Sequence, residues 1–271
     1  MSSFPYKNVV VIGATSGIGL ALAERMIENG VFVIGVGRRK ERLDEFVSKH
    51  GADKCAASQF DITDLESIKP WVEGLLKQHP DVDAVLLNSG IQRTLNFTKP
   101  QEIDLARVHQ EITTNYTSYI TLLASFLPHL QARGGGGAAP RPAAVLAVTS
   151  GLAVVPLARC GNYCATKAAL HSLLWSLRAQ LAGDAGSRHV RVVEILPPAV
   201  RTELHTQQPD LVARGLGDIG ISLREFTDEA WAGLTRGDDE IPVGPRREQL
   251  VKMEEGRRLA FQGMVKDAGT T

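Results

Sequence analysis

The sequence predicts an α/β fold in which a parallel sheet carries helices on both faces. Three observations favour this class: short apolar runs recur along the chain, helical patterns alternate with them, and a glycine-rich turn follows the first run. Strands that are buried on both faces read as unbroken apolar segments, because neither face meets water. We therefore expect a doubly wound sheet.

The expected elements follow one another in a regular strand-helix rhythm. Strands are expected at 8–13, 31–37, 54–61, 83–88, 143–150 and 190–196. Helices are expected at 17–30, 39–50, 64–78, 101–130, 161–183 and 223–236. The glycine-rich segment 133–144 joins a helix to a strand and is expected to be a flexible surface loop.

Composition narrows the class of protein and its partners. Thirty basic side chains balance thirty acidic ones, which argues against a nucleic acid or an anionic membrane as partner. Three cysteines are too few for a disulfide framework, and no apolar run has the length of a membrane span. We expect a cytoplasmic protein. The helix at 169–181 is apolar around most of its circumference, which predicts a homodimer or homotetramer.

The segment "GATSGIG" after the first strand has the glycines of a dinucleotide-binding turn. They allow a tight turn, a close approach to a pyrophosphate and close helix-strand packing, with the phosphates at the helix N-terminus. The alternative is a tight turn without a ligand. The turn residues expected at the cofactor are Gly13, Thr15, Ser16, Gly17, Ile18 and Gly19.

The end of the second strand predicts which dinucleotide binds. An NAD site normally has a carboxylate there for the ribose 2′-hydroxyl, but this chain has Gly37 followed by Arg38 and Arg39. Two guanidinium groups suit a 2′-phosphate, so NADP(H) is expected. The alternative is that both arginines are solvated at a helix start.

Tyr163 and Lys167 are the candidate acid-base pair. At a spacing of four they share one helix face, where an ammonium can favour the phenolate. Lowering a phenol pKa by about 2 to 3 units would make the group useful near neutral pH. The alternative is that they are two polar residues on an ordinary helix. The neighbouring Cys160 and Cys164 are expected to be packing residues rather than a metal or redox site.

Seven motifs, in order, resemble those of the short-chain dehydrogenase/reductase family in its short single-domain form. They are "GATSGIG", "FDIT", "LLNSG", "TTNYT", "VTSG", "YCATK" and "PPAVRT", and they span about residues 8–202. The resemblance implies a Rossmann fold with strand order 3-2-1-4-5-6-7. It also implies one catalytic domain, 1–271, with a variable substrate-binding region at 197–240 and a C-terminal helix at 245–266.

The resemblance also implies the roles of individual residues. The catalytic set would be Asn115, Ser150, Tyr163 and Lys167, with Asn115 in the helix at 101–130 and anchoring a water. Further cofactor contacts would come from Asp61, Ile62, Asn88, Ser89, Gly90, Tyr163, Lys167, Pro197, Val200 and Thr202. Pro198 replaces the glycine that is usual in the last motif, which stiffens that turn and removes one N–H donor.

The expected function is NADP(H)-dependent interconversion of a ketone or aldehyde and an alcohol, with the tyrosine as general acid/base. The alternatives are a redox-neutral dehydratase, epimerase or cyclase on the same fold, and a non-catalytic NADP(H)-binding protein. Arg93, Arg159 and His205 are expected at the rim of the substrate mouth, and His171 is expected to be an ordinary helix residue. The sequence does not predict the substrate.

Overall fold

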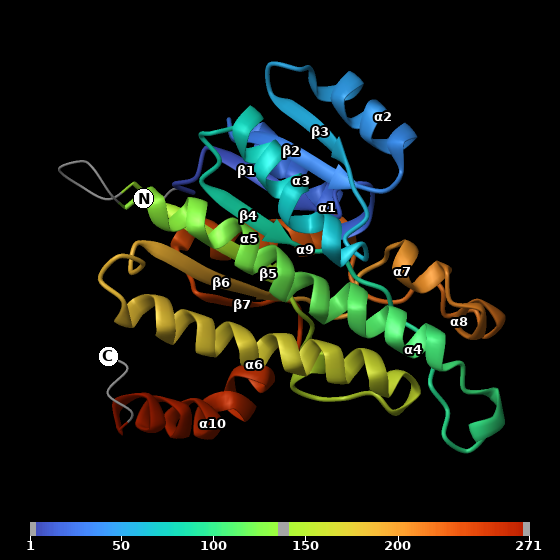
Figure 1. The fold of residues 1–271 in the computed structure, drawn as a ribbon. Helices are drawn as coiled ribbons and strands as arrows, with labels where there is room; N and C mark the ends of the chain where they lie inside the picture. Colours follow the sequence, from blue (N-terminus) through green and yellow to red (C-terminus); the bar gives the residue numbers. More distant parts are fainter. Residues whose placement is uncertain (1–3, 135–140, 268–271) are drawn as a thin grey trace.

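The computed structural model describes residues 4–134 and 141–267, so half of the glycine-rich loop expected at 133–144 lies outside the described residues. Within them, one parallel sheet of seven strands has the order β3-β2-β1-β4-β5-β6-β7 (Figure 1). This confirms the doubly wound sheet and its order. The strands are β1 (Asn8–Ile12), β2 (Phe32–Gly37), β3 (Cys55–Gln59), β4 (Ala84–Leu87), β5 (Ala143–Val148), β6 (Val190–Leu196) and β7 (Glu240–Pro242).

The helices alternate with the strands as far as β6, and several short ones follow. They are α1 (Gly17–Glu28), α2 (Lys40–His50), α3 (Leu65–Gln78), α4 (Leu105–Ile112), α5 (Ser118–Ala132), α6 (Gly161–Gly183), α7 (Glu203–Thr206), α8 (Pro209–Ala213), α9 (Leu223–Arg236) and α10 (Arg247–Asp267).

Two apolar cores lie on opposite faces of the sheet. Alternate residues of β1 enter each of them: Val9 and Val11 face the core formed with α1, α2 and α9, and Val10 and Ile12 face the core formed with α3, α5 and α6. Figure 1 shows α3, α5 and α6 together on one side of the sheet. Burial on both faces explains why these strands are continuously apolar in the sequence.

One regular helix was expected at 101–130, and the structure differs from this prediction. The chain forms α4, then one π-helical turn at Thr113–Thr117, then α5. The buried side chain of Asn115 lies in this turn and hydrogen-bonds outside the helix, to Ile91 and Thr166. Such single-turn bulges interrupt the regular ladder of backbone hydrogen bonds and are frequent at functional sites.

Helix α10 lies against α6. The oligomer was expected because α6 is apolar around most of its circumference, so this contact bears on that expectation. The ring of Trp175 on α6 lies 5.5 Å from that of Phe261, and the guanidinium of Arg257 lies 4.8 Å from the indole. Figure 1 shows α10 running beside α6. The apolar outer face of α6 is thus covered by the same chain. Homo-oligomer formation stays a prediction, and α6 no longer supports it.

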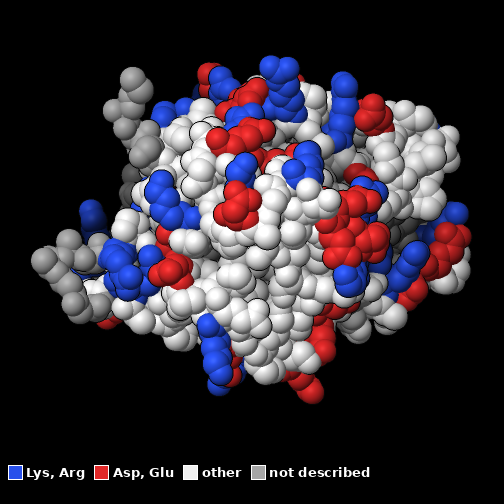
Figure 2. Space-filling model, turned by 90° about the horizontal axis from the view of Figure 1, so that it is seen from above, with Lys and Arg blue, Asp and Glu red and all other residues white. Residues whose placement is uncertain are grey.

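The surface carries both signs of charge. On the face shown in Figure 2, basic and acidic side chains lie beside one another, with white areas between the groups. The ion pairs of the described residues include Lys40 with Asp44 and Arg25 with Asp228. Among the helices of residues 4–134 and 141–267, none is long and apolar enough to cross a bilayer.

Candidate active site

A cleft of about 1520 Å³ runs along the carboxyl ends of the strands. Open α/β sheets bind ligands at this edge, where the loops after neighbouring strands diverge. The glycine-rich turn after β1 lines one end, and Ser150, Tyr163 and Lys167 line the other. Most of the residues predicted for the site line this one cleft; Gly19 and Asn115 do not, although both were expected to act there.

The glycine turn is built by close backbone approach. Gly13 and Gly17 have φ of +91° and +56°, which a side chain would strain. A Cβ on Gly13 would lie 2.8 Å from the Ser89 hydroxyl, and one on Gly19 would lie 2.1 Å from the Gly13 carbonyl oxygen. Gly19 therefore packs α1 against the turn, which is the packing role expected of the last glycine of the motif, while its cofactor contact stays a prediction.

Gly37 leaves no room for an acidic side chain at the end of β2. A Cβ there would lie 2.5 Å from the Thr15 methyl group. The following Arg39 donates to the hydroxyls of Ser16, at 2.6 Å, and Thr15, at 3.0 Å, and it lies 2.7 Å from the carboxylate of Glu203. Arg38 is mostly exposed, with Asp61 3.6 Å away. Both guanidinium groups line the cleft.

The middle of the cleft is formed by the segments after β3 and β4. Asp61 Oδ1 accepts hydrogen bonds from the N–H and hydroxyl of Thr63. Burial acts to raise the pKa of Asp61, but the Thr63 hydrogen bonds and the Arg38 charge outweigh it and hold the pKa below its ordinary value. Asn88 Nδ2 donates to the Gly13 carbonyl at 3.1 Å, which ties this segment to the glycine turn. Ile62, Ser89 and Gly90 also line the cleft here.

Ser150, Tyr163 and Lys167 meet where β5 ends. Ser150 follows the strand, and the other two side chains share one face of α6. The Lys167 ammonium donates a 2.9 Å hydrogen bond to the Val148 carbonyl and lies 5.8 Å from the centre of the Tyr163 ring. All three side chains are buried and line the cleft.

Burial shifts the pKa values of Tyr163 and Lys167 in opposite directions. Burial raises the pKa of Tyr163 above its ordinary value, and a hydrogen bond with Ser150 acts against that rise. The lowered phenol pKa that the spacing predicted is therefore not found here: Tyr163 holds its proton at neutral pH. Burial lowers the pKa of Lys167 to about 8, while the charge of Glu194 acts to raise it. At pH 7 the lysine is mainly an ammonium.

Asn115 holds the loop behind the cleft. Its Oδ1 accepts from the Ile91 N–H at 2.9 Å, and its Nδ2 donates to the Ile91 carbonyl at 2.9 Å and to the Thr166 hydroxyl at 3.1 Å. With these bonds made and no exposed surface, the side-chain amide has its partners within the protein. The expectation that Asn115 anchors a water stays a prediction. Its position next to Thr166 makes it a positioning residue for α6.

The last motif borders the cleft beside Ser150. Pro197, Pro198, Val200 and Thr202 all line it. Pro198 packs closely against the glycine after β7: a Cβ on Gly244 would lie 2.8 Å from the proline ring. Thr202 caps α7, with its hydroxyl accepting from Leu204 N–H at 3.3 Å.

The cysteines beside Tyr163 form a packed cluster. Cys160 Sγ and Cys164 Sγ are 4.0 Å apart, and both side chains pack with Tyr163 and Leu152. Burial, then the neighbouring Cys164, raises the pKa of Cys160 to about 12, so the reactive thiolate is disfavoured. In the described part of the chain, no group of three or more His, Cys, Asp or Glu residues has the arrangement of a metal site.

The three residues expected at the substrate mouth line the cleft, but each already has partners or is buried. Arg159 lies 2.9 Å from Asp210 Oδ2, Arg93 donates to the Arg107 carbonyl at 3.0 Å, and burial lowers the pKa of His205. The cleft is also lined by four residues that the sequence does not predict, Gln92, Glu111, Glu203 and Gln208. No local motif marks these residues, because their partners lie far along the chain.

The sheet order, the glycine turn and the cleft across the strand ends are those of the dinucleotide-binding α/β proteins. A family model described as short chain dehydrogenase matches residues 7–211. The chain belongs to this family of oxidoreductases.

Known proteins similar to the chain include both curated sequences and solved structures. An uncharacterized oxidoreductase of Bacillus subtilis, DltE, is 38% identical over 87% of this chain and 87% of its own. A short chain dehydrogenase from Burkholderia cenocepacia, solved with NADP, is 25% identical, with a TM-score of 0.74 over 97% of this chain and 98% of its own. A Burkholderia phymatum relative, solved with NAD, has a TM-score of 0.80 over 96% and 97% of the two chains at 17% identity, which shows the fold alone.

Proposed function

We propose that the protein is an NADP(H)-dependent oxidoreductase that interconverts a ketone or aldehyde and an alcohol, with Tyr163 as the general acid/base. The observation that carries the proposal is the meeting of Ser150, Tyr163 and Lys167 at one end of the cleft that begins at the glycine turn. Family membership supports the oxidoreductase class. The combination of a proton donor and a dinucleotide cleft suits carbonyl reduction.

The cleft fits a nicotinamide dinucleotide on the evidence of its own residues. Gly13, Gly17 and Gly90 leave their backbone accessible from the cleft. A Cβ at these positions would approach Ser89, Thr202 and Lys167, respectively. Helix α1 begins within the turn, and its N-cap residue Ser16 makes no side-chain capping hydrogen bond, so its first N–H groups suit an anion. When bound there, the reduced cofactor would supply a hydride to the carbonyl carbon.

The proton would come from Tyr163 in the direction of reduction. Because burial keeps its phenol protonated, Tyr163 can donate to the carbonyl oxygen as negative charge builds there. Ser150 would hydrogen-bond the same oxygen, and the Lys167 ammonium would stabilise the phenolate that remains. In the alcohol-to-carbonyl direction, the phenolate would take the proton back. Asn115 acts through the Ile91 loop and Thr166, away from the reacting atoms.

NADP(H) is preferred over NAD(H) in this proposal because of three neighbouring residues. Arg38 and Arg39 bring positive charge to the place where a ribose 2′-phosphate would lie, and Gly37 brings no carboxylate. Glu203 competes for Arg39. The bound NADP of the Burkholderia cenocepacia relative is consistent with this preference.

We also propose a homodimer or homotetramer, with the contact surface on α10 instead of α6. The exposed apolar side chains of α10, Val251, Met253, Leu259 and Met264, are candidates for such a contact. Sedimentation at micromolar concentration tests it, and a Leu259→Glu variant should lower the oligomeric mass. A monomer in the parent protein would contradict it.

The proposed reaction is tested by stoichiometry. Purified protein is incubated with NADPH and a panel of ketones and aldehydes, and NADPH loss is measured with alcohol formation. We expect one alcohol for each NADPH consumed. Substrate conversion without net NADPH loss would instead indicate a redox-neutral enzyme and would contradict the proposal.

A further inference from the structure

Behind Lys167 lies a cluster of buried charged groups that the proposed reaction does not use. Glu194 on β6 has no exposed surface, and His171 on α6 is 1% exposed. His171 Nδ1 lies 2.8 Å from both carboxylate oxygens of Glu194, and Thr149 Oγ1 donates to the same carboxylate. A buried carboxylate is costly unless it is paired and hydrogen-bonded, and the imidazole and the hydroxyl supply these contacts to Glu194.

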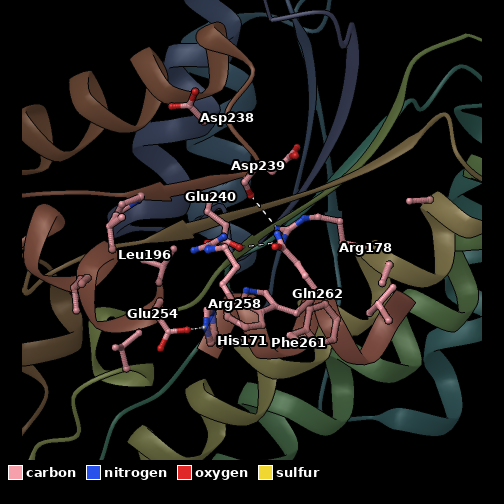
Figure 3. Close-up of a pocket in the computed structure, with 18 of the residues that line it drawn as sticks. His171, Arg178, Leu196, Asp238, Asp239, Glu240, Glu254, Arg258, Phe261 and Gln262 are labelled. Carbon is pink, nitrogen blue, oxygen red and sulfur yellow. Dashed lines mark hydrogen bonds and ion pairs between the residues drawn. The ribbon is translucent and has the colours of Figure 1, made fainter. Parts of the chain in front are cut away.

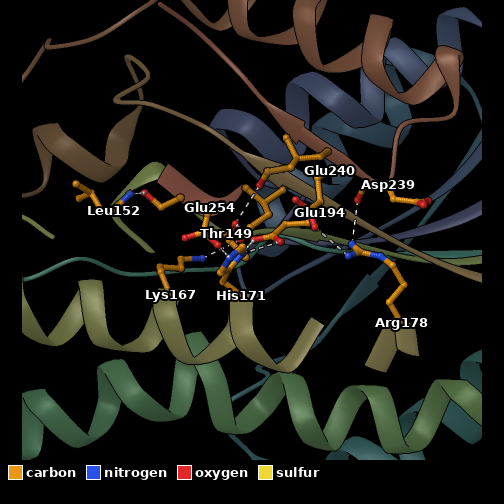
Figure 4. Close-up of polar contacts among 12 residues, drawn as sticks. Thr149, Leu152, Lys167, His171, Arg178, Glu194, Asp239, Glu240 and Glu254 are labelled. Atoms are coloured by element: carbon orange, nitrogen blue, oxygen red, sulfur yellow. Dashed lines mark hydrogen bonds and ion pairs between the residues drawn. The ribbon is translucent and has the colours of Figure 1, made fainter. Parts of the chain in front are cut away.

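The fold brings this cluster to Lys167 in two steps. Lys167 and His171 are four residues apart on α6, so both side chains point from the same helix face toward the sheet. Glu194 pairs in register with Ala147 on β5, two residues before Thr149, so the side chains of Thr149 and Glu194 share one face of the sheet. Figure 4 shows the Lys167 side chain directed toward this group.

The outer side of His171 is closed by the C-terminal helix. His171 Nε2 lies 3.0 Å from Glu254 Oε2, and Arg257 lies 3.2 Å from the same carboxylate. A cavity of about 930 Å³ between α6, β7 and α10 borders this contact, and Figure 3 shows His171 and Glu254 meeting at its edge. The nearby Glu240 is occupied by Arg178, at 3.0 Å, and Arg258, at 2.7 Å.

These neighbours decide which carboxylate acts on Lys167. The lysine ammonium has a neutral acceptor, the Val148 carbonyl, at 2.9 Å. Of the carboxylates, Glu254 lies beyond His171 and is shared with Arg257, and Glu240 is held by two arginines. Glu194 is the anion whose charge raises the pKa of Lys167 against its burial. The imidazole between Glu194 and Glu254 limits that effect when it is protonated.

We propose that Glu194 is a positioning residue of the active site, whose buried carboxylate, held by Thr149 and His171, is the counter-charge that keeps Lys167 an ammonium. This rests on the proposed function only for its effect on turnover. Its test on the charge of Lys167 does not require turnover. Through the His171–Glu254 contact, α10 also contributes a charged group to this cluster.

The test is a direct titration of Lys167. The protein is labelled with [13Cε]lysine, its signal is assigned with a Lys167→Arg variant, and the titration midpoint is followed by NMR. In Glu194→Gln the shape is kept and the charge is lost, so the midpoint should fall by at least about one pH unit. In His171→Gln the Glu194 carboxylate is kept, so the midpoint should not fall. A fall in Glu194→Gln alone would not arise from a merely structural role.

Glu240→Gln is the matched control, because it removes a half-buried carboxylate of the next strand whose partners are arginines. Its Lys167 midpoint should stay within about 0.3 pH unit of the parent. If Glu194→Gln does not fold, Glu194→Asp still tests the role of the charge, because it keeps the carboxylate and should not lower the midpoint as a loss of charge would. A midpoint unchanged in Glu194→Gln, or one that falls in His171→Gln, would overturn the proposal.

Turnover provides the second readout. With the substrate found in the carbonyl panel, the alkaline limb of kcat/KM should move to lower pH in Glu194→Gln, in step with the NMR midpoint. If no carbonyl is reduced, the proposed function fails while the NMR titration still decides the role of Glu194. A loss of turnover at all pH values with an unmoved limb would contradict the positioning role.

Discussion

The guanidinium of Arg39 lies 2.7 Å from the carboxylate of Glu203, and both residues line the cleft. The Arg39 hydrogen bond holds the pKa of Glu203 below its ordinary value, so the carboxylate is charged at neutral pH. A 2′-phosphate would therefore bind Arg39 in competition with Glu203. The preference for NADPH over NADH can therefore be tested by substituting Arg39 and, separately, Glu203.

Removing Arg39 should weaken NADPH binding and leave NADH binding nearly unchanged. In Arg39→Ala the Kd for NADPH should rise about tenfold, which corresponds to one charge-assisted hydrogen bond of about 1.5 kcal/mol. Glu203→Gln should act in the opposite direction, because it frees the guanidinium. Calorimetric titration of both cofactors measures this. Equal losses for NADH and NADPH in Arg39→Ala would count against the assignment.

A side chain at Gly19 should disturb the glycine turn. In Gly19→Ala the new Cβ would lie 2.1 Å from the Gly13 carbonyl oxygen, so backbone has to move. We expect the free energy of unfolding to fall by about 1–3 kcal/mol, as for overpacked cores, with weaker cofactor binding.

Gly74→Ala in α3 is the control, because a Cβ there meets nothing within 4 Å. It should stabilise the protein by about 0.5–1 kcal/mol through helix propensity. Urea unfolding measures both variants. A Gly19→Ala protein as stable as the parent would show that the turn accommodates the methyl group without cost.

The His171 contacts predict how stability depends on pH. Burial acts to lower the pKa of His171, but Glu194 and Glu254 outweigh it and raise the pKa above its ordinary 6.5. The folded state then holds a proton that the unfolded state has lost, so this stabilisation is complete below about pH 6.5 and disappears as pH rises through the folded pKa.

The comparison between the parent and His171→Gln isolates this effect. Above pH 6.5 the parent should lose up to about 1.4 kcal/mol of unfolding free energy per pH unit relative to the variant, until His171 is neutral. Chemical unfolding from pH 5 to 9 measures the difference. A parent that gains stability relative to the variant over this range would reverse the predicted sign.

The sequence predicts the strands β1, β2, β4, β5 and β6 well because they are buried on both faces and therefore almost continuously apolar, whereas the edge strand β3 is only partly buried. The three-residue edge strand β7 has no such run. The π-helical turn also escapes prediction, because it depends on hydrogen bonds from Asn115 to residues 24 and 51 positions away. Helical periodicity contains no trace of such contacts.

The candidate site also contains features that the sequence predicts and features that it does not. Tyr163, Lys167 and the glycine turn could be predicted because their chemistry depends on local spacing. The pKa of Tyr163 and the partners of Arg39 could not, because they follow from burial and from Glu203, 164 residues along the chain. Likewise, Glu254 reaches His171 over 83 residues, through a helix that no motif connects to the cleft.

The proton-donor role of Tyr163 is tested most directly by Tyr163→Phe. The variant is compared with the parent and with Tyr6→Phe, which changes a buried tyrosine outside the cleft. With NADPH and the carbonyl that the parent reduces best, kcat should fall by about 10²–10⁴-fold in Tyr163→Phe, with NADPH binding kept, and should be retained in Tyr6→Phe. Undiminished turnover in Tyr163→Phe would contradict the account.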